Sequence, residues 1–408
     1  MPMSDIKCNF CKSFLKTNLV NFKKIPIANR YTKGDKPIFK KYKLEIKVCN
    51  KCFLVQSTKK IQPKKIFKNY FYKSNYSDTW KEHCKLLTLE LSNTIKNRNK
   101  KILEIGSNDN TLLEMFAKDK WSCVGVEPAT NLVKTNKRNK NIKIYNSFFS
   151  KKIAKKIIKN EGFSDYVVGT NVIAHIPDIC DFFEGLGHLF NLKTIGVFEF
   201  QHLLPMMEGG FYDTIYHEHF FYHSLTTLTK VLDKYGLKVF DIKKLNIHSG
   251  SLRIYVCKKN SEKKTSTRVN NLLNNEKKIG IDKIETYNLF KQKVKIHQEK
   301  LNYLLKIKLK KNLVCAYGAA AKGNTLLNVL SINQNHIKCI FDKSNLKNRL
   351  IFPGTGVKIL SLSNIKKIKP DYILILPWNI KNEIITELKF IKKWNGKFII
   401  PFPKIKII

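Results

Sequence analysis

The sequence predicts an α/β protein with a doubly wound parallel sheet at its centre. Three observations predict it: two Cys-x-x-Cys pairs near the start, a strand–glycine turn–helix–strand unit from Lys101, and a second strand–turn–helix unit from Lys311. The expected domains are a cysteine module at 1–70, the sheet domain at 71–258, a helical linker at 259–310 and an α/β domain at 311–408.

Composition sets the broad class. The 408 residues are 43% hydrophobic, as in ordinary globular proteins, and no apolar run approaches the ~18 residues of a membrane span. The start of the chain does not read as a signal peptide, so we expect a soluble, cytoplasmic protein without membrane partners. The net charge of +45 suggests nucleic acid at first. The excess is mostly lysine and is spread evenly, which favours the amino-acid usage of an A+T-rich genome over an RNA-binding surface.

The cysteine module predicts a metal. Cys8-x-x-Cys11 and Cys49-x-x-Cys52 can each place two thiolates on one ion, which gives closed tetrahedral coordination and a structural Zn²⁺. Four unrelated reduced cysteines are the weaker alternative. A module this small needs the metal to fold. Residues 26–29 are expected as a loop and residues 42–48 as a strand. A helix with Asp78 or Thr79 as its N-cap is expected next, with an apolar face formed by Leu86, Leu87, Leu91 and Ile95.

The central motif begins at Glu104-Ile-Gly106-Ser-Asn-Asp109 and is followed by a second strand that ends at Glu127. An acid in that position suits two ribose hydroxyls, whereas the absence of Gly-x-Gly-x-x-Gly disfavours a dinucleotide. The motif resembles the first motif of class I S-adenosylmethionine (SAM) methyltransferases. That resemblance implies a Rossmann-like sheet, with the turn backbone near the methionine part of SAM and an acid at its ammonium group. Asn110 replaces the usual glycine, and asparagine tolerates a positive φ.

Further strands are expected at 141–145, 165–170, 194–200, 238–243 and 251–257. Asn146 and Phe148 would lie near the adenine, and Asn171 and His175 follow the fourth strand where the sheet opens onto a ligand. A core histidine is the alternative for His175. The sequence lacks the Asn/Asp-Pro-Pro-Tyr of nucleobase N-methyltransferases at this point.

A polar cluster, Tyr216-His217-Glu218-His219, follows the fifth strand. Such groups can move protons near neutral pH. An aromatic-rich surface loop is the alternative interpretation. A helix over about 224–235 is expected after it. If the cluster were extended, its two histidines would face away from Glu218, so we assume a loop that brings Glu218 and His219 together.

The linker at 259–310 is expected to hold a solvated helix. In the C-terminal unit we expect strands at 312–317, 337–342 and 371–376, a small-residue turn at 318–323 and a helix at 324–330. Lys322 at the helix start could meet a phosphate or remain a solvated lysine.

Four long stretches together resemble the C-methyltransferases of nucleotide-activated sugars: residues 211–219, 248–253, 317–328 and 376–379. The resemblance implies methyl transfer from SAM to a carbon, C3, of a nucleotide-linked 4-keto deoxysugar through an enolate. It implies His219 as the base, held with the sugar by Glu218 and Tyr216, and His175 and Tyr76 as donors or relays. The sequence does not show whether His217 or His219 is the base.

The remaining implied residues fall into three sets. The cofactor-binding set is Glu104, Gly106, Asp109, Glu127, Asn146, Phe148 and Asn171, and the metal set is Cys8, Cys11, Cys49 and Cys52. The substrate-binding set is His217, His248, Arg253, Lys322 and Asn324. His248-Ser-Gly stands where the family has His-Gly-Gly. A monomer is expected. A zinc-ribbon RNA-binding or RNA-modifying methyltransferase is the alternative, and Asn110 prompts a third possibility, a catalytically silent relative.

Overall fold

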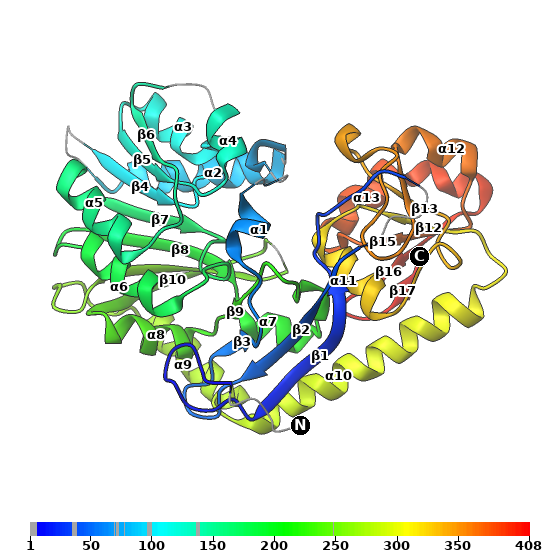
Figure 1. The fold of residues 1–408 in the computed structure, drawn as a ribbon, viewed down its shortest axis with the longest axis horizontal. Helices are drawn as coiled ribbons and strands as arrows, with labels where there is room; N and C mark the ends of the chain where they lie inside the picture. Colours follow the sequence, from blue (N-terminus) through cyan, green and yellow to red (C-terminus); the bar gives the residue numbers. More distant parts are fainter. Residues whose placement is uncertain are drawn as a thin grey trace.

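The structure is a computed structural model that describes residues 6–34, 39–68, 70, 73–76, 78–95, 100–135, 139–247 and 249–408. Figure 1 shows a central sheet domain with helices on both faces, a C-terminal α/β domain beside it, and N-terminal strands at their foot. The long helix α10 (Ile284–Tyr303) runs beneath them toward the C-terminal domain. One continuous apolar core includes side chains from all three parts.

The N-terminal module is a four-stranded sheet in the order β1-β2-β3-β9. Its strands are β1 (Thr17–Pro26), β2 (Lys41–Val48), β3 (Val55–Ser57) and β9 (Phe221–Tyr222), and the short helix α1 (Pro63–Phe67) follows. Strand β2 was predicted. Strand β1 was not, because register shifts after Asn18 and Asn21 interrupt its alternation of apolar and polar residues. The fourth strand comes from the segment that contains the polar cluster, far along the chain.

The central sheet has seven strands in the order β10-β11-β8-β7-β4-β5-β6. They are β4 (Lys101–Ile105), β5 (Ser122–Val126), β6 (Ile142–Tyr145), β7 (Tyr166–Thr170), β8 (Ile195–Gln201), β10 (Leu237–Leu245) and β11 (Ser251–Lys258). Five strands are parallel, and β11 is antiparallel to both of its neighbours. Every strand expected from the sequence is present, so the doubly wound sheet with a terminal antiparallel pair is confirmed.

The helices of this domain are α2 (Asp78–Ser92), α3 (Thr111–Lys118), α4 (Thr130–Thr135), α5 (Lys151–Glu161), α6 (Ile179–Leu189), α7 (Leu203–Gly209) and α8 (Leu225–Lys234), with 3₁₀ turns η1 (Ser74–Tyr76) and η2 (Tyr212–Thr214). Helix α2 begins at Asp78, so this residue and Thr79 lie inside the first turn and neither is the expected N-cap. Its predicted apolar face is corrected: Leu86 is 57% exposed, whereas Trp80, Cys84, Leu87 and Leu91 are buried. The four buried residues recur every three or four positions, which is the true helical stripe.

The linker contains α9 (Thr267–Ile279), α10 and a π-turn, η3 (Leu304–Lys308). Its helical character was predicted, but α10 is not simply solvated. Tyr287, Phe290, Val294 and Leu301 are buried along one side of it. This helix therefore packs as part of the core, while its lysines occupy the exposed side.

The C-terminal sheet has the order β14-β13-β12-β15-β16-β17, parallel except for β17. Its strands are β12 (Val314–Tyr317), β13 (Cys339–Phe341), β14 (Lys358–Leu360), β15 (Tyr372–Ile375), β16 (Lys397–Ile400) and β17 (Lys406–Ile407). The helices are α11 (Ala321–Val329), α12 (Ile365–Ile368) and α13 (Lys381–Glu387), with 3₁₀ turns η4 (Asn345–Lys347), η5 (Leu362–Asn364), η6 (Trp378–Ile380) and η7 (Lys389–Trp394). Within the ranges that the structure describes, no helix has the length and apolar character needed to cross a membrane.

Candidate functional site

The four predicted metal ligands come together in the N-terminal module. The sulfur atoms of Cys8, Cys11, Cys49 and Cys52 all lie within 4.8 Å of one another. The Cys8–Cys52 and Cys11–Cys49 sulfur distances are 3.6 and 3.4 Å. Thiolates bound to one tetrahedral Zn²⁺ stand roughly this far apart, because each Zn–S bond is about 2.3 Å long. The donor set therefore fits a closed, structural zinc site.

Gln56 of β3 connects this metal site to the rest of the module. Its side-chain amide donates to the Cys8 sulfur at 3.2 Å, and its side-chain oxygen accepts from the Asn9 backbone at 2.8 Å. Gln56 also faces Phe221 across the β3–β9 pair. The metal site and the segment with the polar cluster are thus held by the same strand.

The turn between β4 and α3 is the predicted cofactor site. Glu104 is buried, and one of its carboxylate oxygens has no hydrogen-bond partner; the same is true of the Ser107 hydroxyl and the Asn110 side-chain oxygen. Burial, with Glu127 and Asp109 nearby, raises the pKa of Glu104 well above its ordinary value. A cationic ligand would relieve this cluster of acids. Unpaired buried acceptors beside acids fit the ammonium group of SAM.

The backbone of this turn is left-handed at three residues, Gly106, Asn108 and Asn110. Gly106 has φ +76°, and a Cβ there would lie 3.1 Å from a methyl group of Val172. Asn110 has φ +63° and stands immediately before α3. The expectation that asparagine could hold the conformation of the usual glycine agrees with this geometry.

Glu127 follows β5 and already receives two backbone N–H groups, from Asn108 and Ala129, both at 2.7 Å. Burial raises its pKa although these N–H groups oppose the shift. Asn146 donates to the Glu127 carbonyl at 2.7 Å, so these two predicted residues are neighbours. The half-buried Phe148 packs edge-on against Phe67.

The remaining cofactor candidates frame the same edge of the sheet. Asp109 accepts from the Asn75 backbone at 3.0 Å, which brings η1 to the turn. Asn171, with φ +55°, directly follows β7 and donates through its backbone to the Glu199 carbonyl at 2.8 Å. Tyr76 belongs to η1, but its side chain lies outside the described residues, as does the whole of His248.

The polar cluster folds as a tight turn. The His219 backbone N–H donates to the Tyr216 carbonyl at 3.0 Å, and the two rings lie against each other with centroids 4.0 Å apart and planes tilted by 35°. The Nδ1 atom of His219 lies 2.8 Å from the Thr214 carbonyl. Because a carbonyl only accepts, Nδ1 carries the proton and Nε2 keeps its lone pair. His219 is therefore held in the tautomer of a base.

His175 lies against this turn from the loop after β7. Its ring centroid is 4.8 Å from that of His219, and its Nδ1 donates to the Glu218 carbonyl at 2.8 Å. Burial lowers the pKa of His175 to about 4. A neutral ring with Nδ1–H engaged offers only the Nε2 lone pair. His175 and His219 are thus two imidazoles with the same tautomer in edge-to-face contact.

The Glu218 carboxylate points away from both rings. It is 3% exposed and accepts from the Asn29 amide at 3.1 Å and the Tyr70 hydroxyl at 3.2 Å. Burial raises its pKa to about 7, against the opposing effect of these two donors and of Arg30. The expected turn is present, but Glu218 meets His175 through its backbone, and its side chain is held by the N-terminal part of the chain.

His217 is directed elsewhere. Its Nε2 donates to the Tyr42 carbonyl of β2 at 3.1 Å, and its Nδ1 is buried without a partner. Burial lowers its pKa to about 4. The turn therefore sends its two histidines in different directions: the His219 ring contacts Tyr216 and His175, whereas His217 meets β2.

The C-terminal domain contributes the first turn of α11. Lys322 donates to the Ser249 hydroxyl at 3.0 Å and lies over the Trp378 ring at 5.2 Å. Asn324 donates to the Pro353 carbonyl at 3.0 Å, and its side-chain oxygen is buried without a partner. One oxygen of the buried Asp213 is also unpaired, while the other accepts from the Trp378 indole at 2.7 Å. Unpaired polar atoms thus gather here as well.

Arg253 lies apart from the turn at 216–219 and from the first turn of α11. It is buried in β11, where its guanidinium pairs with Glu199 at 2.6 Å and Glu90 at 2.9 Å. Protein carboxylates already engage it on two sides, which is the arrangement of a structural ion pair. Arg253 is therefore not part of the proposed substrate site.

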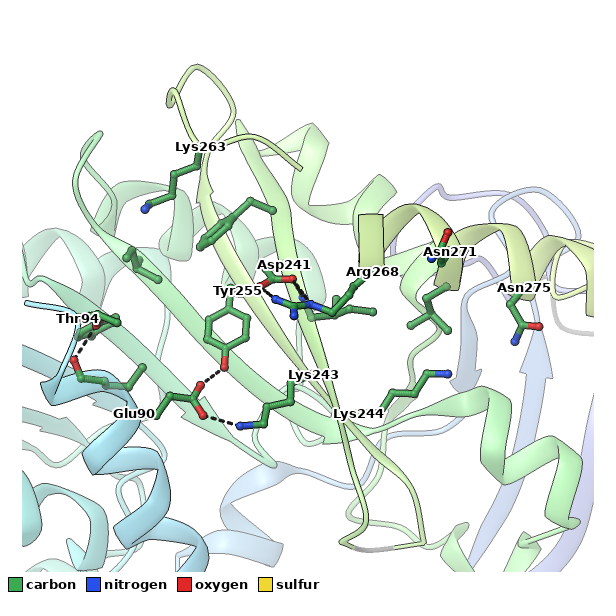
Figure 2. Close-up of a pocket in the computed structure, with 16 residues that line it drawn as sticks. Glu90, Thr94, Asp241, Lys243, Lys244, Tyr255, Lys263, Arg268, Asn271 and Asn275 are labelled. Carbon is green, nitrogen blue, oxygen red and sulfur yellow. Dashed lines mark hydrogen bonds and ion pairs between the residues drawn. The ribbon is translucent and has the colours of Figure 1, made fainter. Parts of the chain in front are cut away.

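Figure 2 shows a cavity of about 820 Å³ between α2, α9 and the outer strands β10 and β11. Its acids are already paired: Glu90 with Lys243 at 2.7 Å and Asp241 with Arg268. It is lined by none of the sequence-predicted site residues and by none of the unpaired buried side-chain atoms in the part of the chain that the structure describes. Its size alone does not make it the reaction site.

Sequence reasoning did not identify four residues that the structure places around the cluster: Asn29, Tyr70, Asp213 and Trp378. Asp213 and Trp378 lie inside stretches that carried the family resemblance. For Asn29 and Tyr70 no local pattern was available, because each meets the cluster across a long sequence separation. The hydrogen bond from Asn29 joins residues 189 positions apart.

Family comparisons match three consecutive parts of the chain. The family described as "Putative zinc binding domain" matches residues 8–67, "Methyltransferase domain" matches 76–242 and "C-methyltransferase C-terminal domain" matches 246–403. C-methyltransferase NovU of Streptomyces niveus is 27% identical over 409 residues, covering 98% of this chain and 96% of that protein.

Solved structures are similar over less of the chain. The PH0226 protein of Pyrococcus horikoshii OT3 is 12% identical with a TM-score of 0.37, covering 48% of this chain and 97% of that one. Magnesium protoporphyrin IX methyltransferase ChlM of Synechocystis PCC 6803, with bound SAH, is 10% identical with a TM-score of 0.34, covering 44% and 82%. Likenesses this low carry no conclusion about function.

Proposed function

Because this chain is a SAM-dependent C-methyltransferase with a zinc-binding domain and a C-methyltransferase C-terminal domain, we propose that its acceptor is a nucleotide-linked 4-keto deoxysugar. The methylated carbon is C3, and the reaction passes through an enolate. SAM, when bound, supplies the electrophilic methyl group at the edge formed by Glu104, Gly106 and Glu127. Asp109, Asn146, Phe148 and Asn171 complete that edge.

The observation that carries the proposal is the tautomer of His219. Carbon becomes nucleophilic only when a proton is removed next to a carbonyl, so the reaction needs a base. The Thr214 carbonyl, 2.8 Å from Nδ1, fixes the ring proton of His219 on that atom, so Nε2 is the basic atom proposed to take the C3 proton. The contact with Tyr216, at 4.0 Å between ring centroids, holds the ring in place.

His175 suits the role of a hydrogen-bond acceptor better than that of a donor or relay. Burial lowers its pKa to about 4, so the ring resists taking up a proton, and its N–H is engaged by the Glu218 carbonyl. Its Nε2 lone pair is proposed to accept a hydrogen bond from a sugar hydroxyl. The Tyr216 hydroxyl, together with Tyr76, is proposed to donate to the developing enolate oxygen.

The nucleotide is proposed to bind at the start of α11. Lys322 is a cation at the N-terminus of this nine-residue helix, where anions are favoured. It is bonded to Ser249, the neighbour of His248 in the sequence. The unpaired side-chain oxygen of Asn324 offers an acceptor for a base or sugar donor. His217, buried beside β2, is proposed to line the sugar side of the same space.

The direct test is incubation of the protein with SAM and a panel of dTDP-4-keto-deoxysugars. A product heavier by one methylene unit, with loss of the C3 proton, is expected by mass spectrometry and proton NMR. If SAM binds but no sugar gains mass or exchanges its C3 proton, the substrate class is wrong.

The base is tested by His219→Ala. We expect kcat to fall by about 10²- to 10⁴-fold, the usual contribution of a general base, with the calorimetric Kd for SAM unchanged. His217→Ala separates the two histidines, and a smaller loss is expected because its ring meets β2. Full turnover by His219→Ala would overturn the assignment.

A further inference from the structure

Asn29 stands at the point where the three parts of the molecule meet. It follows β1 and has φ +62°, a left-handed conformation that favours asparagine over most residues. Its side-chain amide donates to one Glu218 oxygen at 3.1 Å, while the Tyr70 hydroxyl donates to the other at 3.2 Å. Both oxygens of this buried carboxylate are thus held by residues that precede the central sheet.

A second contact carries this arrangement into the C-terminal domain. The Tyr31 hydroxyl lies 3.1 Å from the Asn29 side-chain oxygen and 2.7 Å from the Ala319 carbonyl. Ala319 belongs to the turn before α11, the helix that carries Lys322. Lys347 donates to the same carbonyl at 2.9 Å. The single hydroxyl proton of Tyr31 is shared between these two oxygens, so a chain of polar contacts runs from Glu218 through Asn29 and Tyr31 to the turn before α11.

We propose that Asn29 is a positioning residue for the methyl transfer: its amide holds the Glu218 carboxylate and, through Tyr31, ties it to the C-terminal domain. The inference rests on the proposed function, because Glu218 supports the two histidines assigned there. Its carbonyl fixes His175, and its place in the turn sets the direction of His219. A displaced Glu218 would misalign both rings at once.

The charge of Glu218 depends on few groups. Asn29, Arg30 and Tyr31 face it from the N-terminal module and Tyr70 from the segment before α2, whereas His175 meets the backbone carbonyl of Glu218. Among these, Arg30 is the one permanent cation. Within the described residues, Asn29 and Tyr70 donate hydrogen bonds to the carboxylate. Replacement of the Asn29 amide by an acid would therefore act directly on Glu218.

The chain offers a matched control. Asn21 of β1 donates to Glu45 of β2 at 3.2 Å, an amide–carboxylate pair of the same kind in the same module. Glu45 is also buried, but its other partners are Lys43 and Thr58, away from the cluster. Asn21→Asp and Asn29→Asp therefore make the same chemical change beside two different carboxylates.

The first readout is the pH profile of kcat in the full chain. Asn29→Asp is expected to move the acidic limb to higher pH by about one unit or more, because two adjacent carboxylates resist joint ionisation. Asn29→Gly keeps the left-handed backbone and is expected to lower kcat about 10-fold or more, with SAM Kd unchanged. Asn21→Asp should leave kcat and its profile as in the wild type. An unmoved profile in Asn29→Asp would overturn the catalytic role.

The second readout needs no substrate. The difference in unfolding free energy between Glu218 and Glu218→Gln proteins, followed against pH, reports the titration of Glu218. Asn29→Asp should move its midpoint upward, whereas Asn21→Asp should not. If no sugar is methylated, the proposed substrate fails while this readout still decides whether Asn29 controls Glu218. An unchanged midpoint overturns the inference even if methylation is found.

Discussion

The proposed SAM-binding edge, residues 104–127, and the proposed catalytic turn, residues 216–219, are built in opposite ways. The SAM edge takes its acids, its left-handed backbone and its unpaired oxygens from one short unit, residues 104–127, within one domain. The catalytic turn at 216–219 takes its supports from Asn29, Tyr70, His175 and, through Tyr31, Ala319. One site is local and the other is assembled from all three parts of the chain.

This difference teaches where each site is vulnerable. A local site depends on the stability of its own sheet, so distant changes should leave it intact. An assembled site depends on every contact that brings its parts together, because positioning errors of about 1 Å can cost two orders of magnitude in rate. We expect perturbations of the N-terminal module to separate SAM binding from turnover.

Loss of the metal should show the largest separation. Cys49→Ser removes one of four ligands and the folding free energy that a structural zinc provides, about 10–16 kcal/mol in zinc-finger peptides. We expect no bound zinc and no measurable turnover, because β3 also pairs with β9 of the cluster segment, while calorimetry still detects SAM binding. Metal analysis and a methyl-transfer assay check this.

Cys257→Ser on β11 is the control for that variant, since Cys257 is buried in the central sheet, outside the metal site. It should keep one zinc per chain and normal turnover. Loss of SAM binding in Cys49→Ser in step with turnover would contradict the separation of the two sites.

Glu127→Ala should weaken SAM binding and largely keep turnover, the reverse of Cys49→Ser. It removes the acid proposed to hold the ribose and leaves two backbone N–H groups unpaired, so SAM affinity is expected to fall about 10- to 100-fold. At saturating SAM, kcat should stay within a few-fold of the wild type. Glu114→Ala on α3 is the control, and an unchanged Kd for SAM in Glu127→Ala would remove this residue from the cofactor site.

Glu218→Gln should have the smallest effect, an increase in the free energy of unfolding. The native pKa of about 7 lies above the ordinary 4.5, so the folded protein holds this proton more tightly than the unfolded chain. Glu218 thus lowers stability progressively as pH rises from about 4.5 to 7. Above pH 7 the amide should gain about 1–3 kcal/mol in denaturant unfolding, with little gain at pH 4. A gain independent of pH would contradict the burial argument.

The sequence predicted the parts of the molecule that are locally encoded. All seven strands of the central sheet and the four-cysteine site follow from short patterns, and Asn110 was expected to hold a positive φ. Strand β1 was not predicted because its bulges break the alternation of side chains. The apolar face of α2 was misassigned at Leu86 because the leucines at 86, 87, 89 and 91 are spaced too closely to mark one stripe.

The catalytic turn was predictable in composition but not in direction. Its residue types indicated proton transfer, yet only the fold sends His217 toward Tyr42 and His219 toward Thr214. Arg253 illustrates the same limit: nothing in its motif indicates that Glu199 and Glu90 occupy its guanidinium. Glu199, Glu90 and Tyr42 lie 54, 163 and 175 residues from their partners, and such separations leave no local pattern to read.

The pairing of β3 with β9 has a consequence for engineering chimaeras. Val55 and Gln56 lie opposite Tyr222 and Phe221, and the Ser57 backbone donates to the Phe220 carbonyl at 2.9 Å. A graft that exchanges only residues 6–68 with a relative would cut through this sheet. The transplantable unit is therefore discontinuous, the N-terminal module together with residues 211–223. Substrate-swapping experiments should move both pieces as one cassette.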